Sequence, residues 1–195
     1  MQEIRQGRDM EKREARRRAR SRHQALCQAE QERADRAIEK AILESDAFRE
    51  ANRIFTYLSI PGEPDTWGIV RTALAMGKTV CVPRCLPCGI MQAVQIRSLE
   101  GLIPTTWGIQ EPADTEEAET QMHWDLILVP CVSAGRDGRR LGHGAGYYDR
   151  FLVQCTGTTF CLCYAALMEN ALPVDETDVL MDFIVSERGI EKVEA

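Results

Sequence analysis

The chain has 195 residues, of which 44% are hydrophobic and 28% charged, a composition that supports a folded core and excludes a disordered protein. No apolar run approaches the roughly 20 residues needed to cross a bilayer, and the charged N-terminal segment is unlike a secretory signal. Eight cysteines are too few for a disulfide scaffold, so we expect reduced thiols in a cytoplasmic protein.

Charge is distributed unevenly along the chain. The net charge is −6, but residues 1–22 contain nine basic and four acidic side chains, which leaves −11 on the remainder. A basic segment of this kind suits a nucleic acid, a membrane surface or a small anionic ligand. Charge alone does not choose between these three partners.

The predicted elements alternate between helix and strand. Strong helix formers without Gly or Pro predict helices at residues 9–29 and about 31–49. The next predictions, in chain order, are a strand at 53–60, a helix at 66–76, strands at 78–84, 90–96 and 125–130, a helix at 147–154, and strands at 158–164 and 183–186. The acidic segment 111–125 is expected to be an exposed loop or a short helix.

This order of elements is typical of an α/β protein with a mostly parallel sheet. We therefore expect one three-layer, Rossmann-like domain over residues 1–195, preceded by two N-terminal helices. Residues 1–8 are expected to be flexible.

A glycine-rich segment follows the strand expected at 125–130 and leads into the helix expected at 147–154. Ligands of doubly wound sheets bind at the carboxyl ends of strands, where glycines let backbone N–H groups approach phosphate oxygens. Gly142, Gly144 and Gly146 alternate, but their spacing matches neither a Walker A loop nor the dinucleotide fingerprint. On its glycines alone, the segment fits a phosphate site and a flexible loop equally well.

Cysteine spacing offers a competing interpretation. The pattern Cys81-x-x-x-Cys85-x-x-Cys88 has the spacing of the iron–sulfur motif of radical S-adenosylmethionine enzymes, and Cys161-x-Cys163 would add a second thiol pair for zinc. Cys81 and the second pair fall within predicted strands. We therefore favour cysteines that pack as small hydrophobic residues over a metal site.

The string R-L-G-x-G-x-G-Y-Y-D-R at 140–150 is more specific than its glycines. It resembles the signature of the 5-formyltetrahydrofolate cyclo-ligases, also called methenyltetrahydrofolate synthetases. Further segments match this family in the same order: Lys12-x-x-x-Arg16, S-I-P-G-E-P-D-T at 59–66, Pro83-Arg84, W-G-I-x-E-P at 107–112, the strand at 125–130, Leu172-Pro173, Asp178, Asp182 and I-V-S-E at 184–187. The resemblance covers residues 9–190.

The resemblance implies an enzyme that uses ATP and Mg²⁺ to convert 5-formyltetrahydrofolate into 5,10-methenyltetrahydrofolate, with release of ADP and phosphate. The formyl oxygen is phosphorylated first, and ring closure then expels phosphate. Such a transfer depends on positioning and on neutralising phosphate charge, so no covalent enzyme nucleophile is expected. The expected partners are ATP and a reduced folate, without nucleic acid or membrane, and the expected state is a monomer or weak homodimer.

The resemblance also implies roles for particular residues. Lys12 and Arg16 would reach the ATP phosphates, and Asp149 and Asp178 would hold Mg²⁺. The nucleotide cradle would consist of Arg140, Leu141, Gly142, His143, Gly144, Ala145, Gly146, Tyr147 and Tyr148. The folate contacts would be Leu58, Glu63, Trp107 and Tyr148, with Trp107 as an aromatic wall for the pterin.

Other interpretations stay open at this point. Cys131, Ala134 and Gly135 stand where relatives carry a Gly and a Phe-Asp pair, so a diverged nucleotide-binding paralogue that acts on another formyl or amino compound is one alternative. A nucleic-acid-binding protein that uses the basic segment is a weaker one. The remaining arginines of that segment have no predicted role: Arg13, Arg17, Arg18, Arg20 and Arg22.

Overall fold

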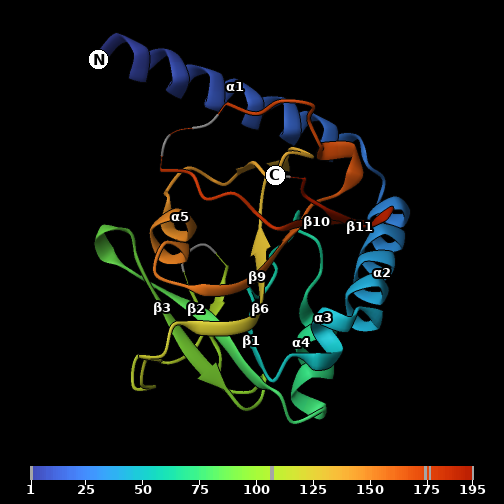
Figure 1. The fold of residues 1–195 in the computed structure, drawn as a ribbon, viewed down its shortest axis with the longest axis vertical. Helices are drawn as coiled ribbons and strands as arrows, with labels where there is room; N and C mark the ends of the chain where they lie inside the picture. Colours follow the sequence, from blue (N-terminus) through green and yellow to red (C-terminus); the bar gives the residue numbers. More distant parts are fainter. Residues whose placement is uncertain (1, 106–107, 174, 176, 195) are drawn as a thin grey trace.

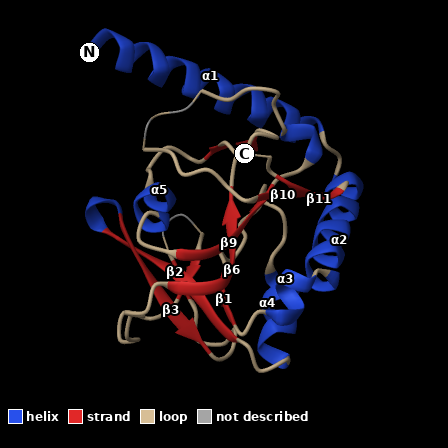
Figure 2. Ribbon diagram, viewed as in Figure 1, coloured by secondary structure: helices blue, strands red, loops and turns tan. Residues whose placement is uncertain are grey.

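The described residues form a central sheet of seven strands (Figure 2). The structure is a computed structural model that describes residues 2–105, 108–173, 175 and 177–194. In spatial order the strands are β11 (Gly189–Lys192), β10 (Phe183–Ser186), β9 (Thr156–Leu162), β6 (His123–Pro130), β1 (Arg53–Phe55), β2 (Thr79–Leu86) and β3 (Ile90–Ile96). The inner strands are parallel, whereas β11 and β3 at the two edges are antiparallel to their neighbours. The predicted mostly parallel α/β fold is confirmed.

Helices cover the sheet on two sides, and one more crosses its end (Figure 1). On one side lie α2 (Gln28–Glu44), α3 (Asp46–Glu50) and α4 (Trp67–Ala75), and on the other lies α5 (Tyr147–Leu152). The long helix α1 (Gln2–Ala25) passes over the carboxyl ends of the strands, where it contacts β7 (Ser133–Ala134) and the 3₁₀ turn η2 (Ala165–Leu167). None of the helices among the described residues is both long and apolar enough to span a membrane.

Aromatic side chains fill the layer between the sheet and α5. The Phe55 ring of β1 lies 5.6 Å from the Trp124 ring of β6 and 4.6 Å from the Phe151 ring of α5, measured between centroids. All three are almost completely buried, and burying each of them stabilises the fold by about 2–3 kcal/mol. The packing of this layer fixes the strands whose ends carry the site.

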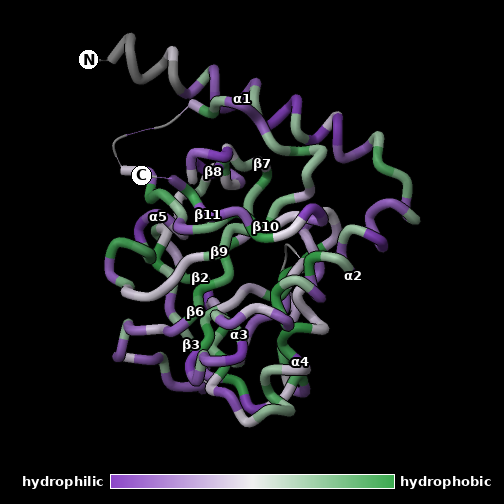
Figure 3. The backbone as a smooth tube through the Cα atoms, turned by 45° about the vertical axis from the view of Figure 1, so that its right-hand side comes forward, coloured by the Kyte–Doolittle hydropathy of each residue, from purple (hydrophilic) through white to green (hydrophobic). Residues whose placement is uncertain are grey.

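A different contact holds α1 in place. Its buried residues Ala15 and Ala19 are small, and Ala15 packs against Leu141 and Leu172 in a separate apolar cluster. Most of the described part of α1 is hydrophilic, in contrast to β6 and β9 (Figure 3). The helix therefore rests on the end of the sheet through a narrow apolar stripe.

Two predicted elements are shorter than expected because side chains compete for the backbone. The helix expected to run from about 31 to 49 breaks at Ser45, whose hydroxyl donates to the Ile42 carbonyl (2.7 Å) and accepts from the Phe48 N–H (3.2 Å). The strand expected at 53–60 ends at Phe55. Beyond it, the Thr66 hydroxyl donates to the Tyr57 carbonyl (2.7 Å), which closes a loop in place of further pairing.

Smaller corrections concern the ends of elements and short strands. The first helix begins at Gln2 and ends at Ala25, whereas residues 9–29 were predicted. The acidic segment begins in β5 with Glu111 and reaches β6 at His123, and the residues between them form a loop without a helix. Glu111 in this segment is buried, not exposed, because its carboxylate accepts from the Cys85 N–H (3.2 Å). Strands without a prediction are β11 and the short pairs β4 (Ile103–Pro104) with β5 (Gln110–Glu111) and β7 with β8 (Arg140–Leu141).

Candidate functional site

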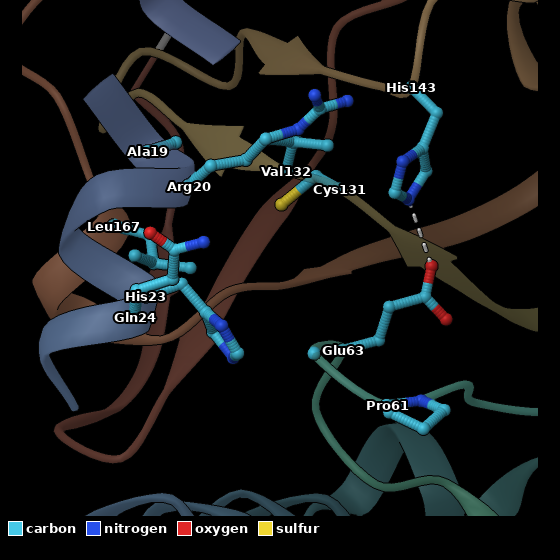
Figure 4. Close-up of a pocket in the computed structure, with 11 residues that line it drawn as sticks. Ala19, Arg20, His23, Gln24, Pro61, Glu63, Cys131, Val132, His143 and Leu167 are labelled. Atoms are coloured by element: carbon cyan, nitrogen blue, oxygen red, sulfur yellow. Dashed lines mark hydrogen bonds and ion pairs between the residues drawn. The ribbon is translucent and has the colours of Figure 1, made fainter. Parts of the chain in front are cut away.

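The strand order creates a crevice between β1 and β6. From β1 the chain proceeds to β2 on one side, and it later returns to place β6 on the other side of β1. In α/β sheets, ligands bind outside the carboxyl ends of the strands at such a reversal. The loops that follow β1 and β6 meet here and, together with α1, enclose a cavity of about 180 Å³ (Figure 4).

Glu63, from the loop after β1, presents its carboxylate to this cavity. The side chain is 11% exposed, and its Oε1 lies 3.3 Å from Nε2 of His143 in the glycine segment (Figure 4). The loop is held from beneath, because the Tyr164 hydroxyl donates to both the Glu63 carbonyl (3.1 Å) and the Asp35 carboxylate (2.7 Å). Glu63 and His143 are therefore brought together from positions 80 residues apart in the sequence.

Gly62 gives the loop beside α1 a backbone conformation that favours glycine. Its φ is +101°, a conformation that side chains rarely adopt. A Cβ at this position would also lie 3.5 Å from the His23 ring, which lines the cavity from α1. The Nε2 atom of His23 is buried and has no hydrogen-bond partner among the described residues.

The glycine segment is attached to α1 by Arg16. The Arg16 Nε donates to the Gly142 carbonyl (2.8 Å), and a Cβ at Gly144, where φ is +109°, would lie 3.3 Å from the guanidinium carbon. Burial, and after it the charge of Arg20, lowers the pKa of Arg16. The guanidinium therefore lies directly against the backbone that the sequence predicts to be a phosphate cradle.

Lys12, one turn earlier on α1, lies between two carboxylates. Its Nζ is 2.7 Å from an oxygen of Asp175 and 2.7 Å from one of Asp178. Burial acts to lower the pKa of Lys12, but the two carboxylates outweigh it and the pKa is raised. Lys12 is therefore protonated, and it fixes the C-terminal segment beside the glycine segment.

Asp149, at the start of α5, also has a basic partner. The Arg140 side chain is 3% exposed and donates to the Asp149 carboxylate (2.6 Å), while its guanidinium lies 5.8 Å from the centre of the Tyr148 ring. The same carboxylate accepts from the Val179 N–H (3.4 Å), next to Asp178. The two aspartates predicted to hold a metal thus lie on adjoining segments.

The paired tyrosines of the signature differ in their environments. The Tyr147 hydroxyl donates to the Leu86 carbonyl (3.1 Å) at the end of β2. The Tyr148 hydroxyl is buried without a partner in the described part of the chain. Burial, followed by the nearby Glu63 carboxylate, raises the pKa of Tyr148 well above its usual value, so this hydroxyl is a proton donor without an acceptor.

The structure places other predicted residues away from the cavity. Leu58 is buried in the hydrophobic core, and Leu141 packs under α1. Ala145 uses its carbonyl to accept from the Arg150 guanidinium (2.6 Å). Trp107 lies outside the described residues.

Of the three positions that depart from the family pattern, only one lines the cavity. Cys131 does so at the end of β6. Ala134 is buried in β7, and the N–H of Gly135 donates to the Arg139 carbonyl (2.8 Å) within the tight turn that follows. Ala134 and Gly135 therefore belong to β7 and the turn after it, and neither residue is part of the cavity wall.

Sequence reasoning missed three polar residues of α1 that line the cavity together with Ala19. These are Arg20, His23 and Gln24. Arg20 is four residues after Arg16, and side chains at this spacing share a helix face. The spacing was available as a signal, but it gave no indication of what the face approaches.

The cysteines of the competing motif are spread over β2 and the turn after it. Burial raises the pKa of Cys81 and of Cys85 to about 12, so both thiols are protonated, while Cys88 is exposed. Across the described residues, no group of three or more His, Cys, Asp or Glu side chains is arranged to hold a metal ion.

Comparison with known proteins identifies the family. The model of the 5-formyltetrahydrofolate cyclo-ligase family matches residues 8–187. The chain belongs to this family. The predicted family and enzyme class are therefore confirmed.

Individual cyclo-ligases are similar over most of their length. A probable 5-formyltetrahydrofolate cyclo-ligase of Caenorhabditis elegans is 31% identical over 182 residues, which cover 83% of this chain and 85% of the relative. The Mus musculus 5-formyltetrahydrofolate cyclo-ligase is 30% identical over 176 residues, which cover 84% of this chain and 87% of the relative. The NMR structure of Aquifex aeolicus 5,10-methenyltetrahydrofolate synthetase is similar with a TM-score of 0.83 at 26% identity. The match covers 94% of this chain and 93% of the Aquifex aeolicus chain.

Proposed function

We propose that this chain converts 5-formyltetrahydrofolate into 5,10-methenyltetrahydrofolate, with consumption of ATP and release of ADP and phosphate. The observation that carries the proposal is the contact between Glu63 and His143 across the cavity (3.3 Å). It joins the loop predicted to bind folate to the segment predicted to bind nucleotide. A phosphoryl transfer between two bound substrates needs the two sites to adjoin in this way.

The chemistry explains why ATP is needed. An N-formyl group is a weak electrophile because the nitrogen lone pair is delocalised. The formyl oxygen attacks the γ-phosphorus, and the bond to ADP breaks. The neighbouring secondary amine then attacks the formyl carbon and loses its proton to solvent, and the carbon–oxygen bond breaks to release phosphate.

Basic side chains of α1 and the glycine backbone suit the nucleotide. Lys12 and Arg16 would bind phosphate oxygens, since both lie beside the glycine segment. The N–H groups of residues 142–146 would supply further donors aimed at developing charge. Positioning and charge neutralisation are the main requirements of such a transfer.

Glu63 and Tyr148 suit the folate. The Glu63 carboxylate can accept hydrogen bonds from ring N–H groups, and the unpartnered Tyr148 hydroxyl can donate one. A buried donor without a partner is costly, so a ligand that accepts from it gains affinity. The folate contacts of Leu58 and Trp107 stay predictions.

The residues predicted to hold Mg²⁺ fit that ion. Mg²⁺ takes oxygen ligands and commonly uses one or two carboxylates together with waters and substrate phosphates. Asp149 and Asp178 offer two carboxylates on adjoining segments, each already close to a basic side chain. When bound, the ion would neutralise phosphate charge that Lys12 and Arg140 do not reach.

Pairing within α1 disfavours the nucleic-acid alternative. Arg18 and Arg22 are engaged by the Glu169 carboxylate of the same chain, so these two cations are not free for a phosphate backbone. A cytoplasmic location and a monomer or weak homodimer stay predictions.

The proposal is tested by mixing the protein with ATP, Mg²⁺ and 5-formyltetrahydrofolate and following the absorbance of methenyltetrahydrofolate. We expect product only when ATP is present. Glu63→Gln should raise the KM for the folate about tenfold and leave the KM for ATP near its original value. Folded protein that forms no ATP-dependent product would refute the assignment.

A further inference from the structure

The structure gives partners to most basic residues of α1 that had no predicted role. Arg18 and Arg22 both pair with Glu169, and Arg22 also donates to the Met168 carbonyl (3.2 Å). Arg17 pairs with Glu14 at 3.7 Å. These contacts attach α1 to the segment after η2 or stay on the helix surface, so they need no ligand.

Among the residues that the structure describes, Arg13 and Arg20 have neither a hydrogen bond nor an ion pair, and of these two only Arg20 lines the cavity. Its side chain extends from α1 over the cavity towards Val132 and His143 (Figure 4). An unpaired guanidinium over a cavity favours an anion there.

The position of Arg20 along α1 indicates which substrate supplies that anion. Arg16, one turn earlier, touches the glycine segment, while His23, about one turn later, lies against Gly62 of the Glu63 loop. Successive turns of a helix advance by about 5.4 Å, so Arg20 lies on α1 between these two contacts. The anion then comes from the substrate that occupies this cavity beside Glu63, and Arg16 is left for the phosphates.

The polarity of the cavity agrees with the polarity of a folate. The Glu63 carboxylate in its wall would repel an anion and suits the uncharged ring. The volume of about 180 Å³ is below the roughly 300–1,000 Å³ of pockets that enclose a whole drug-sized ligand, so part of the substrate must extend past the mouth. That part of a reduced folate is its glutamyl tail, which carries two carboxylates.

We propose that Arg20, assisted by the Gln24 amide, forms a subsite for the carboxylates of the glutamyl tail at the mouth of the cavity. A guanidinium matches a carboxylate with two parallel hydrogen bonds, a geometry that lysine does not provide. The inference rests on the proposed function, because it assumes a folate substrate. It assigns specificity to a residue that the family signature does not include.

The subsite is tested with two compounds that differ only in the glutamyl tail. These are 5-formyltetrahydrofolate and 5-formyltetrahydropteroate, which lacks the glutamate. Arg20→Ala should raise the KM for the first about tenfold and leave the KM values for the second and for ATP within twofold. Arg20→Lys should recover only part of the loss. Arg13→Ala is the matched control, since Arg13 is an exposed arginine of the same helix that does not line the cavity, and it should change none of the constants.

Each other outcome overturns the inference. A higher KM for ATP in Arg20→Ala would show that Arg20 binds phosphate. An equal rise in KM for 5-formyltetrahydrofolate and for 5-formyltetrahydropteroate would show that Arg20 does not bind the glutamyl tail. Equilibrium binding of both compounds without ATP distinguishes failure of the inference from failure of the proposed function. Tighter binding of the glutamyl compound that disappears in Arg20→Ala supports the subsite even if no product forms, and wild-type protein without that preference refutes it.

Discussion

The central sheet and α1 are held in place by different forces. In the sheet, Phe55 is completely buried between Trp124 and Phe151. In α1, the apolar contacts are alanines, and the long-range contacts are charged, as between Lys12 and Asp178. The element that carries the cations of the site is therefore the one that substitution or salt can loosen while the sheet stays folded.

Removing a large core side chain should have the largest effect on stability. Phe55→Ala deletes a ring that packs against two others, and we expect a loss of about 3–5 kcal/mol in the free energy of unfolding. Denaturant titration followed by circular dichroism measures it. A loss below about 1 kcal/mol would show that the aromatic layer does not dominate the stability of the sheet.

Removing the charge of Lys12 should affect α1 and the site more than the sheet. Lys12→Met leaves Asp175 and Asp178 without their shared cation, and we expect a loss of about 1–3 kcal/mol together with a KM for ATP about tenfold higher. Hydrogen exchange should report faster opening of α1 but little change in β6.

The control for this variant is Lys40→Met, because Lys40 is an exposed residue of α2 whose carboxylate partner lies 3.9 Å away. The raised pKa of Lys12 adds a pH test. Its stabilisation is fully present below the ordinary lysine value of 10.5 and is lost as pH rises through the raised value. An unchanged KM for ATP in Lys12→Met would remove Lys12 from the nucleotide site.

Loosening the Glu63 loop should have a smaller effect. Tyr164→Phe removes the hydroxyl that donates to the Glu63 carbonyl and to Asp35, and we expect a loss of about 1 kcal/mol. The KM for the folate should rise a few-fold while the KM for ATP stays constant. Steady-state kinetics with each substrate varied in turn measures both, and a change confined to ATP would contradict the placement of the loop.

The smallest expected effect is at an exposed carboxylate of the sheet. Asp125 accepts from the N–H groups of Arg53 (2.8 Å) and Asn52 (2.7 Å), which lower its pKa below the ordinary 3.8. Its stabilisation is present above that value and is lost as pH falls through the lowered pKa. Asp125→Asn should lower the free energy of unfolding by less than about 1 kcal/mol at pH 7. The melting temperatures of the two proteins should differ at pH 7 and become equal in acid. A difference in melting temperature that persists in acid would exclude the carboxylate charge as the cause.

Sequence reasoning succeeded where one local pattern decides the structure. The alternation of apolar and polar residues at 90–96 predicts β3 with its observed bounds, because side chains of a half-buried strand alternate between two faces. It failed where a single hydroxyl redirects the backbone, as at Ser45 and Thr66. Helix propensity summed over a window does not register such individual hydrogen bonds.

The same distinction applies to the site. Glu63, His143 and Arg16 belong to motifs, so a resemblance in sequence marks them. Arg20 and Gln24 lie outside those motifs, and their position depends on where α1 crosses the sheet. That crossing is fixed by contacts such as Ala15 with Leu172, between residues at opposite ends of the chain.

The pairing of Lys12 with Asp178 has a consequence for the newly made protein, because 166 positions separate the two residues. At about 5–20 residues per second, a ribosome needs roughly 10–30 seconds to add that length. During this time α1 lacks the C-terminal carboxylates that later pair with Lys12. The basic segment is therefore made well before the partners of Lys12, and it reaches these native contacts late.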